Sequence, residues 1–162
     1  MEESLIRSAI TDATINTFAD MTFIDVLEDE EKRPFEAGQL LFIEFDRPIY
    51  GRLLLTMPPE LKQAIVENIH AVSWDELSVS EIDDCLLEVL NVLAGNFLRS
   101  LHEENVKVHL NFPHVMFSYE EITDLNTFDV YYFNAEGSPF TISLALHQEG
   151  EVQADNGRGD AR

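Results

Sequence analysis

The sequence predicts an α+β domain in which antiparallel β-hairpins pack with long helices. Two pairs of apolar runs are each joined by a short turn-forming segment, and two stretches space their apolar residues as helices do. The chain has 162 residues, of which 45% are hydrophobic, and it contains 11 phenylalanines but only 7 glycines and 6 prolines. That length and composition suit one globular domain with a single core.

The N-terminal half alternates helical and extended patterns. Residues 4–21 show helical apolar spacing, residues 21–26 resemble a short strand, and the acidic cluster 28–31 is interpreted as a solvated loop. Residues 40–45 and 49–57 predict a hairpin. The Pro58–Pro59 pair then begins a helix, because proline is tolerated in a first turn. Two capping boxes follow, Ser73 with Glu76 and Ser78 with Glu81, and the second introduces a long helix over residues 80–103.

The C-terminal half returns to strands. Residues 106–112 alternate up to Pro113, and residues 128–133 and 140–147 predict a second hairpin. Alternation along these strands predicts a core position for seven aromatic side chains: Phe42, Phe45, Phe112, Phe117, Phe128, Phe133 and Phe140. We expect a single domain over residues 1–147, followed by a flexible tail over residues 148–162 that is acidic and contains glycine.

Charge and cysteine content exclude several function classes. Ten basic and 31 acidic residues give a net charge of −21, which argues against binding to nucleic acid, anionic lipid or free nucleotides. A single cysteine excludes an internal disulfide and a multi-thiolate zinc site, and His102, His109 and His114 match no metal-ligand spacing. No signal peptide or membrane span is recognisable. We therefore expect a cytoplasmic protein without a metal site.

The long helix over residues 80–103 carries the one segment that indicates chemistry. Asp84, Glu88, Asn91 and Gly95 follow one another at i, i+4, i+7 and i+11, so they lie on one face within about 60°. The remaining positions are almost all apolar. These four residues could be the ordinary solvent face of the helix, but asparagine and glycine are unfavourable in a helix interior. The alternative is a docking ridge that carries a reactive pair.

The pair Glu88 and Asn91 suits hydrolysis of a phosphate that a partner protein presents. A carboxamide can position a water molecule for in-line attack on phosphorus. A carboxylate would repel the phosphate itself, but it can pair with a lysine of the partner. Cys85 lies about 100° from this stripe and is interpreted as a core residue.

The pattern Asp84-x3-Glu88-x2-Asn91, continued by Leu93–Ala94–Gly95–Asn96, resembles the signature of the CheX/CheC/FliY chemotaxis phosphatases. The order of elements around it, over residues 40–147, is also similar. The single copy of the motif resembles CheX more than CheC, which carries two copies. The resemblance implies a CheC-like fold.

The resemblance also implies a function for each matched residue. Glu88 would pair with the lysine of a phosphorylated CheY-like receiver domain in chemotaxis or two-component signalling, and Asn91 would position the water that attacks the aspartyl phosphate. Asp84 and Gly95 would belong to the docking surface. The chain would be an aspartyl-phosphate phosphatase with no cofactor of its own, because the receiver supplies Mg²⁺, and it would form a homodimer through strands.

Two alternatives remain open at this point. Related flagellar switch proteins share the fold without the Glu–Asn pair, so the chain could bind a receiver or a switch component without hydrolysis. It could also be an unrelated acidic adaptor in which Glu88 and Asn91 are ordinary surface residues.

Overall fold

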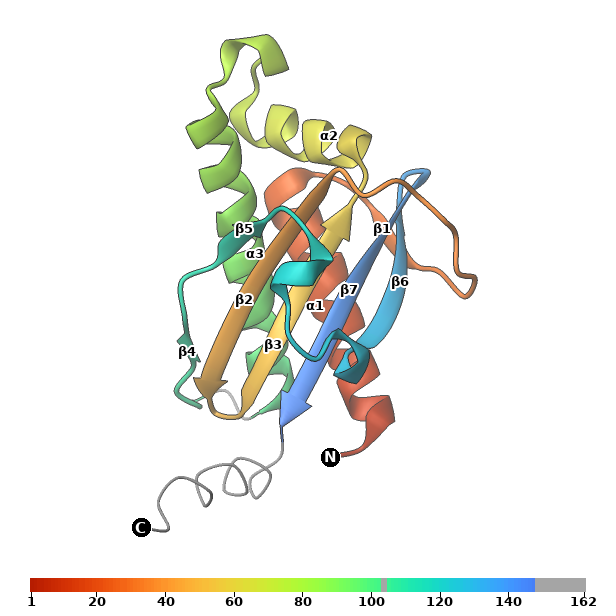
Figure 1. Ribbon diagram of the computed structural model, residues 1–162, viewed down its shortest axis with the longest axis vertical. Helices are drawn as coiled ribbons and strands as arrows, with labels where there is room; N and C mark the ends of the chain where they lie inside the picture. The colour runs from red at the N-terminus through yellow and green to blue at the C-terminus, as the bar shows by residue number, and fades with distance from the viewer. Residues whose placement is uncertain (103–104, 148–162) are drawn as a thin grey trace.

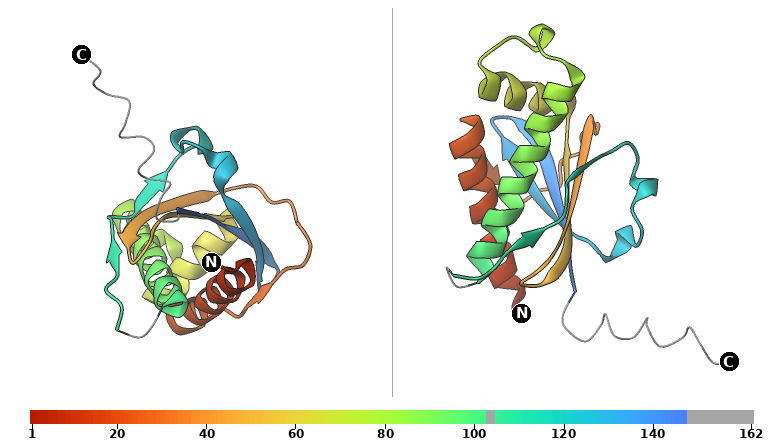
Figure 2. Two further views of the ribbon diagram at one scale, coloured as in Figure 1. Left: turned by 90° about the horizontal axis from the view of Figure 1, so that it is seen from below. Right: turned by 90° about the vertical axis from the view of Figure 1, so that its left-hand side faces the viewer.

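A computed structural model describes residues 1–102 and 105–147, and the predicted tail over residues 148–162 lies outside them. The described chain forms one antiparallel sheet with two long helices, α1 and α3, side by side across one face (Figures 1 and 2). The helices and 3₁₀ turns are α1 (Glu3–Thr22), α2 (Pro59–His70), η1 (Trp74–Glu76), α3 (Val79–Leu101), η2 (Tyr119–Glu121) and η3 (Leu125–Thr127). This arrangement confirms the predicted α+β class.

The sheet contains seven strands in the order β1-β6-β7-β3-β2-β4, and β5 also pairs with β2. The strands are β1 (Val26–Glu28), β2 (Gln39–Arg47), β3 (Tyr50–Met57), β4 (His109–Leu110), β5 (His114–Met116), β6 (Asp129–Ala135) and β7 (Ser138–His147). Both predicted hairpins are present, as β2–β3 and β6–β7. The turn of the second hairpin is held by the Gly137 N–H, which donates to Asn134 Oδ1 over 2.8 Å.

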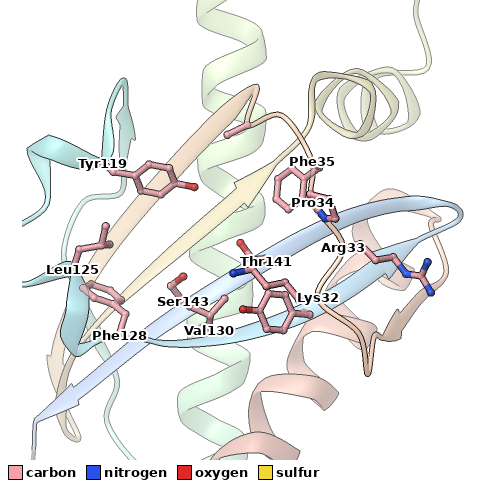
Figure 3. Close-up of a pocket in the computed structure, with 12 residues that line it drawn as sticks. Lys32, Arg33, Pro34, Phe35, Tyr119, Leu125, Phe128, Val130, Thr141 and Ser143 are labelled. Atoms are coloured by element: carbon pink, nitrogen blue, oxygen red, sulfur yellow. The ribbon is translucent and has the colours of Figure 1, made fainter.

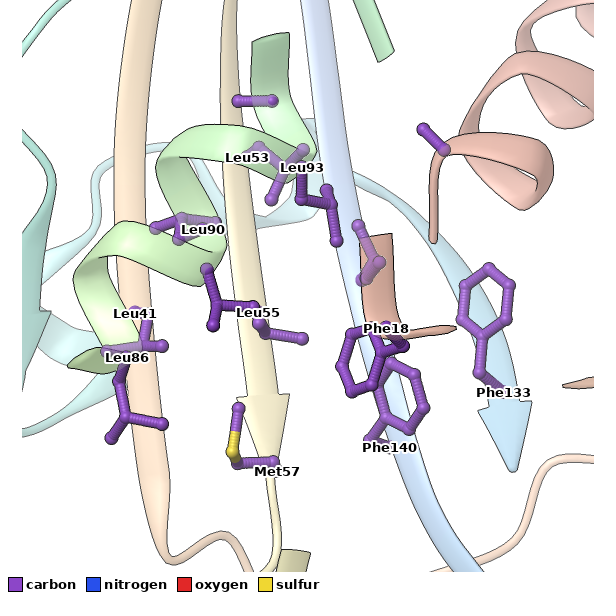
Figure 4. Packing of buried hydrophobic residues seen from close by; sticks show 14 of the residues in the cluster. Phe18, Leu41, Leu53, Leu55, Met57, Leu86, Leu90, Leu93, Phe133 and Phe140 are labelled. Atoms are coloured by element: carbon purple, nitrogen blue, oxygen red, sulfur yellow. The ribbon is translucent and has the colours of Figure 1, made fainter. Parts of the chain in front are cut away.

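The main core lies between the sheet and the helices (Figure 4). From α3, Leu86, Leu90 and Leu93 point toward β2 and β3, and all three are fully buried. On the α1 side, the rings of Phe18 and Phe140 stack with centroids 5.0 Å apart, and Phe133 continues the stack at 5.4 Å from Phe140. This packing fixes α3 against the sheet, so only a narrow strip of the helix faces outward.

A smaller core lies on the other face of the sheet. The segment between β5 and β6, which contains η2 and η3, crosses part of that face and buries Ile122 and Phe128 against it. Their partners from the sheet are Leu40, Phe42, Leu54 and Ala145. No helix among the described residues covers the rest of this face (Figure 2).

The structure corrects the prediction for residues 106–117. Only His109 and Leu110 of the expected strand pair with β2, and the sheet continues beyond Pro113 as β5. Phe112 and Phe117 are 87% and 84% exposed, so their assignment to the core is wrong. Phe112 lies between β4 and β5, where the proline that follows it has no N–H for the ladder.

The structure also corrects the predicted position of the first strand. The helix α1 extends to Thr22 and ends at Phe23, which adopts a left-handed conformation with φ of 59°. The strand β1 therefore begins at Val26 rather than near Met21. Its last residue, Glu28, belongs to the acidic cluster for which a loop is predicted. The Glu28 carboxylate forms an ion pair with Arg7 of α1.

Candidate functional site

The site is built on α3, a helix of 23 residues whose first turn is firmly capped. Ser78 Oγ accepts from the Glu81 backbone N–H over 3.1 Å, and the Ser78 N–H donates to the Glu81 carboxylate over 3.2 Å. These hydrogen bonds lower the pKa of Glu81 and satisfy backbone groups that the helix start leaves free. The cap sets where the helix begins, and the packing of its apolar side against the sheet determines which residues face outward.

Three of the four predicted stripe residues lie together on the outer face of α3. Asp84 and Glu88 are exposed and Asn91 is half-buried, whereas the neighbouring Cys85 and Val89 are buried. Within residues 1–102 and 105–147, the side chains of Glu88 and Asn91 make no hydrogen bond or ion pair. Both side chains are therefore available to a partner.

Asp84, Glu88 and Asn91 line an open hollow of about 430 Å³, which we call the α3 hollow. The opposite wall comes from the connection between β4 and β5, and it is mainly apolar. The complete lining is Asp84, Leu87, Glu88, Asn91, Leu110, Asn111, Phe112 and Pro113. The Asn111 N–H donates to the Glu44 carbonyl over 2.9 Å and so attaches this wall to β2.

A second hollow, of about 380 Å³, lies on the other side of Asp84 and Glu88. It is bounded by Met21, Ile69 and His70 from the ends of α1 and α2, together with Cys85 of α3. The two carboxylates therefore form a crest between two depressions. A surface of this shape can fit a partner that inserts a side chain on either side of the crest.

Cys85 borders this second hollow, but its chemistry does not suit a nucleophile. Burial raises the pKa of its thiol above the ordinary value. The side chain thus stays protonated at neutral pH, in agreement with its interpretation as a core residue.

Gly95 lies apart from the other three residues. It is buried, and a Cβ atom added there would come within 3.2 Å of Arg99 Nη1. The Arg99 side chain, one turn further along α3, therefore covers the glycine. A role for Gly95 in docking stays a prediction, since the structure does not bring it to the α3 hollow.

Sequence reasoning missed the apolar wall of the α3 hollow. Phe112 was assigned to the core because it continues the alternation of Val108 and Leu110. The signal that could have identified it is the proline at position 113. Proline ends the pairing that would hold the aromatic ring against the sheet.

The described part of the chain contains neither a cluster of metal-ligating side chains nor a helix that could cross a membrane. Within residues 1–102 and 105–147, no three His, Cys, Asp or Glu side chains lie where they could hold a metal ion together. None of the helices in that part is long and apolar enough to cross a membrane.

Comparison with solved structures places this fold among chemotaxis proteins. CheX from Desulfovibrio desulfuricans is 17% identical, with a TM-score of 0.69 over 88% of this chain and 99% of that one. CheX from Borrelia burgdorferi, solved with CheY, BeF₃ and Mg²⁺, is 16% identical with a TM-score of 0.66 over 88% and 97%. The FliM middle domain of Vibrio alginolyticus is 11% identical with a TM-score of 0.59 over 93% and 95%.

Sequence comparison is more specific than the shared fold. No curated protein matches the chain significantly. The family model described as chemotaxis phosphatase CheX matches residues 40–130, which include α2, α3, the α3 hollow and the strands β3 to β5 with nearly all of β2. The chain therefore belongs to the CheX family of chemotaxis phosphatases.

Proposed function

We propose that this chain accelerates hydrolysis of the aspartyl phosphate on a phosphorylated CheY-like receiver domain. The observation that carries the proposal is the placement of Glu88 and Asn91. They lie one turn apart on the outer face of α3, line the same hollow, and have no hydrogen-bond partner among the described residues. Membership of the CheX family and the likeness to a CheX solved with CheY support the choice of a receiver as substrate.

Asn91 would act on the attacking water. Its carboxamide has two N–H donors and an accepting oxygen, so it can hold a water molecule in a fixed direction toward phosphorus. Its half-buried position on a packed helix restricts its movement. Positioning of this kind is expected to accelerate hydrolysis on the order of 10²-fold.

Glu88 would hold the receiver in place. A lysine beside the acyl phosphate could form an ion pair with the exposed Glu88 carboxylate, and Asp84 one turn earlier adds a second negative charge to the crest. The receiver would then enter with its own Mg²⁺, so this chain would need no cofactor. Phe112 would pack against an apolar part of the receiver surface, because it stands exposed on the facing wall.

We further propose a homodimer formed through strands, in a cytoplasmic protein. One edge of the sheet is formed by β4 and β5 and the other by β1, and edge strands offer unpaired backbone groups to a second chain. Analytical ultracentrifugation tests this point: a single species of one protomer's mass at micromolar concentration would exclude the dimer.

The alternative is a binding module that docks a receiver or a flagellar switch component without hydrolysis. A FliM middle domain is similar to this chain in fold, and a shared fold does not by itself establish catalysis. That likeness is the observation that favours the alternative. Binding modules and phosphatases of this fold would differ in what they do to the phosphoryl lifetime of the receiver.

The test measures loss of ³²P from labelled, Mg²⁺-bound CheY-type receivers with and without this chain. In parallel, binding to the same receivers loaded with beryllofluoride is measured by calorimetry. Faster loss of phosphate supports the phosphatase. Binding with an unchanged lifetime across the receivers of the organism would replace it by the binding module, and no binding at all would leave only the acidic adaptor.

A further inference from the structure

The face of the sheet away from α1 and α3 carries a pocket of about 300 Å³, which we call the sheet-face pocket (Figure 3). Its floor is formed by Val130 and Tyr132 of β6 and by Thr141 and Ser143 of β7. One wall is the irregular segment over residues 32–37, and the other is the segment that contains Tyr119 and Phe128. The volume falls at the lower end of the range for small-molecule sites.

Aromatic side chains enclose this pocket from three directions. Phe35 stands on one wall and Tyr119 and Phe128 on the other (Figure 3). Tyr132 of β6 also lines the pocket. Aromatic rings favour offset or edge-to-face packing with another ring, and such a pair adds about 0.5–1.5 kcal/mol beyond the buried area. The shape and composition therefore suit a flat aromatic ligand.

The charge of the pocket is opposite to that of the protein. Lys32 and Arg33 line it and no carboxylate does, although the chain has 31 acidic and only 10 basic residues. Arg33 is neutralised by Asp29, whose Oδ2 lies 2.7 Å from Arg33 Nε. Within the described ranges, Lys32 has no carboxylate within 4.0 Å, so its positive charge is available to a ligand.

A buried cation, the Arg52 side chain, lies against the ring of Phe128 outside the pocket lining. The Arg52 guanidinium is 4.7 Å from the centroid of the Phe128 ring and only 7% exposed. Its Nη1 donates to the Thr123 carbonyl over 2.8 Å, and Glu44, its cross-strand neighbour on β2, does not approach within 4.0 Å. Arg52 therefore adds positive charge to this face of the sheet, and Glu44 offsets it in part.

Hydroxyl groups complete the site. Thr141 and Ser143 lie two residues apart on the same side of β7, so both line the pocket, and Tyr132 contributes a phenolic group. The Tyr119 hydroxyl already donates to Thr56 Oγ1 over 3.4 Å. Hydroxyl groups can donate hydrogen bonds to a carboxylate without carrying charge themselves. Aromatic walls, donors on the floor and a free cation at the rim together select one ligand chemistry.

We infer that the sheet-face pocket binds a small aromatic carboxylate. The ring would pack between Phe35 and Phe128, and the carboxylate would face Lys32 and the hydroxyls of β7. Because α3 lies on the opposite face of the sheet, such a ligand would leave Glu88 and Asn91 uncovered (Figures 1 and 2). The inference therefore stands independently of the proposed phosphatase activity.

The experiment is an amide NMR titration with two probes of equal shape, 2-naphthoate and 2-naphthylmethanol. We expect 2-naphthoate to shift, saturably, the resonances of residues 32–37, 119–132 and 141–143, and to bind at least fivefold more tightly than the alcohol. Lys32→Glu should weaken 2-naphthoate about tenfold and leave the alcohol unchanged. The matched control Lys107→Glu reverses an exposed lysine that does not line the pocket.

Equal affinity for the two probes, an unchanged affinity in Lys32→Glu, or shifts centred elsewhere would overturn the inference. A second copy of the chain could occupy the pocket instead. In that case the same resonances would move with protein concentration when no probe is present, and the assignment to a small ligand would be wrong.

Discussion

Phe112 stands 87% exposed at the α3 hollow, in contact with water that a docked partner would displace. Burying a phenylalanine side chain is worth about 1.5–3 kcal/mol, which corresponds to tenfold or more in affinity. We therefore expect Phe112→Ala to weaken binding of a beryllofluoride-loaded receiver about tenfold, as measured by calorimetry. Phe117→Ala is the matched control, since Phe117 is 84% exposed and does not line the hollow. Equal effects of both changes would remove Phe112 from the docking surface.

Tyr131 predicts how stability changes at alkaline pH. Burial, followed by the charge of Asp129, raises the pKa of its hydroxyl above the ordinary value of 10.0. Above about pH 10 the unfolded chain releases this proton before the folded chain does, so the stabilisation present at lower pH is lost as pH rises through the folded-state pKa. Urea unfolding at pH 8 to 11 should show a smaller alkaline loss in Tyr131→Phe than in wild type. Tyr132→Phe controls for removal of a hydroxyl from the same strand, and identical slopes for Tyr131→Phe and wild type would contradict the burial argument.

The element that carries the site is α3, and its N-terminal cap is open to a direct test. Ser78→Ala removes the hydroxyl that accepts from the Glu81 N–H, so we expect a loss of about 0.5–2 kcal/mol in the free energy of unfolding. Urea denaturation measures this loss. Ser80→Ala is the matched control, because Ser80 is exposed in the first turn and its side chain forms no hydrogen bond among the described residues. A loss no larger than that of Ser80→Ala would show that the Ser78 hydroxyl does not contribute to the free energy of unfolding.

Regular elements were predictable because their periodicity is strong. The apolar spacing of α3 predicts which of its faces is buried, and apolar runs separated by turn-forming residues predict both hairpins; the structure confirms these elements. The region around Phe112 was not predictable on the same grounds. Alternation indicates which side chains share a face, but it does not show whether a partner strand extends far enough to cover them, and β4 pairs with β2 at only two positions.

The candidate site was likewise predictable only in part. The spacing of Asp84, Glu88 and Asn91 on one helix is a local property, so the sequence placed them on one face correctly. The apolar wall opposite depends on how residues about 20 positions away return to α3, which no local pattern encodes. Gly95 falls on the same stripe in the sequence, yet the Arg99 side chain covers it in the structure.

At the scale of the whole molecule, the net charge of −21 dominates the electrostatics. Repulsion among 31 carboxylates disfavours the compact state, and salt screens it over a Debye length of about 10 Å at 0.1 M. We therefore expect the melting temperature to rise by a few degrees between 0.02 and about 0.3 M NaCl, as measured by calorimetry. Only a few ion pairs oppose this trend in the described chain, and most are exposed. A melting temperature that falls with salt would mean that attractive pairs outweigh the repulsion.

The fold by itself does not decide between catalysis and docking, because it is shared with a FliM middle domain as well as with CheX proteins. The distinction depends on a few atoms at the α3 hollow. Among these, the Asn91 carboxamide is the group that would act on the attacking water, while Glu88 and Phe112 would hold the partner.

The most direct test of that claim compares wild type with Asn91→Ala in the decay of ³²P from a Mg²⁺-bound receiver. Asn16→Ala is the matched control, since it removes the same group from an exposed position on α1. We expect Asn91→Ala to lose the acceleration, on the order of 10²-fold, while it still binds a beryllofluoride-loaded receiver, and Asn16→Ala to behave as wild type. Acceleration that survives in Asn91→Ala would contradict the proposed role of Asn91.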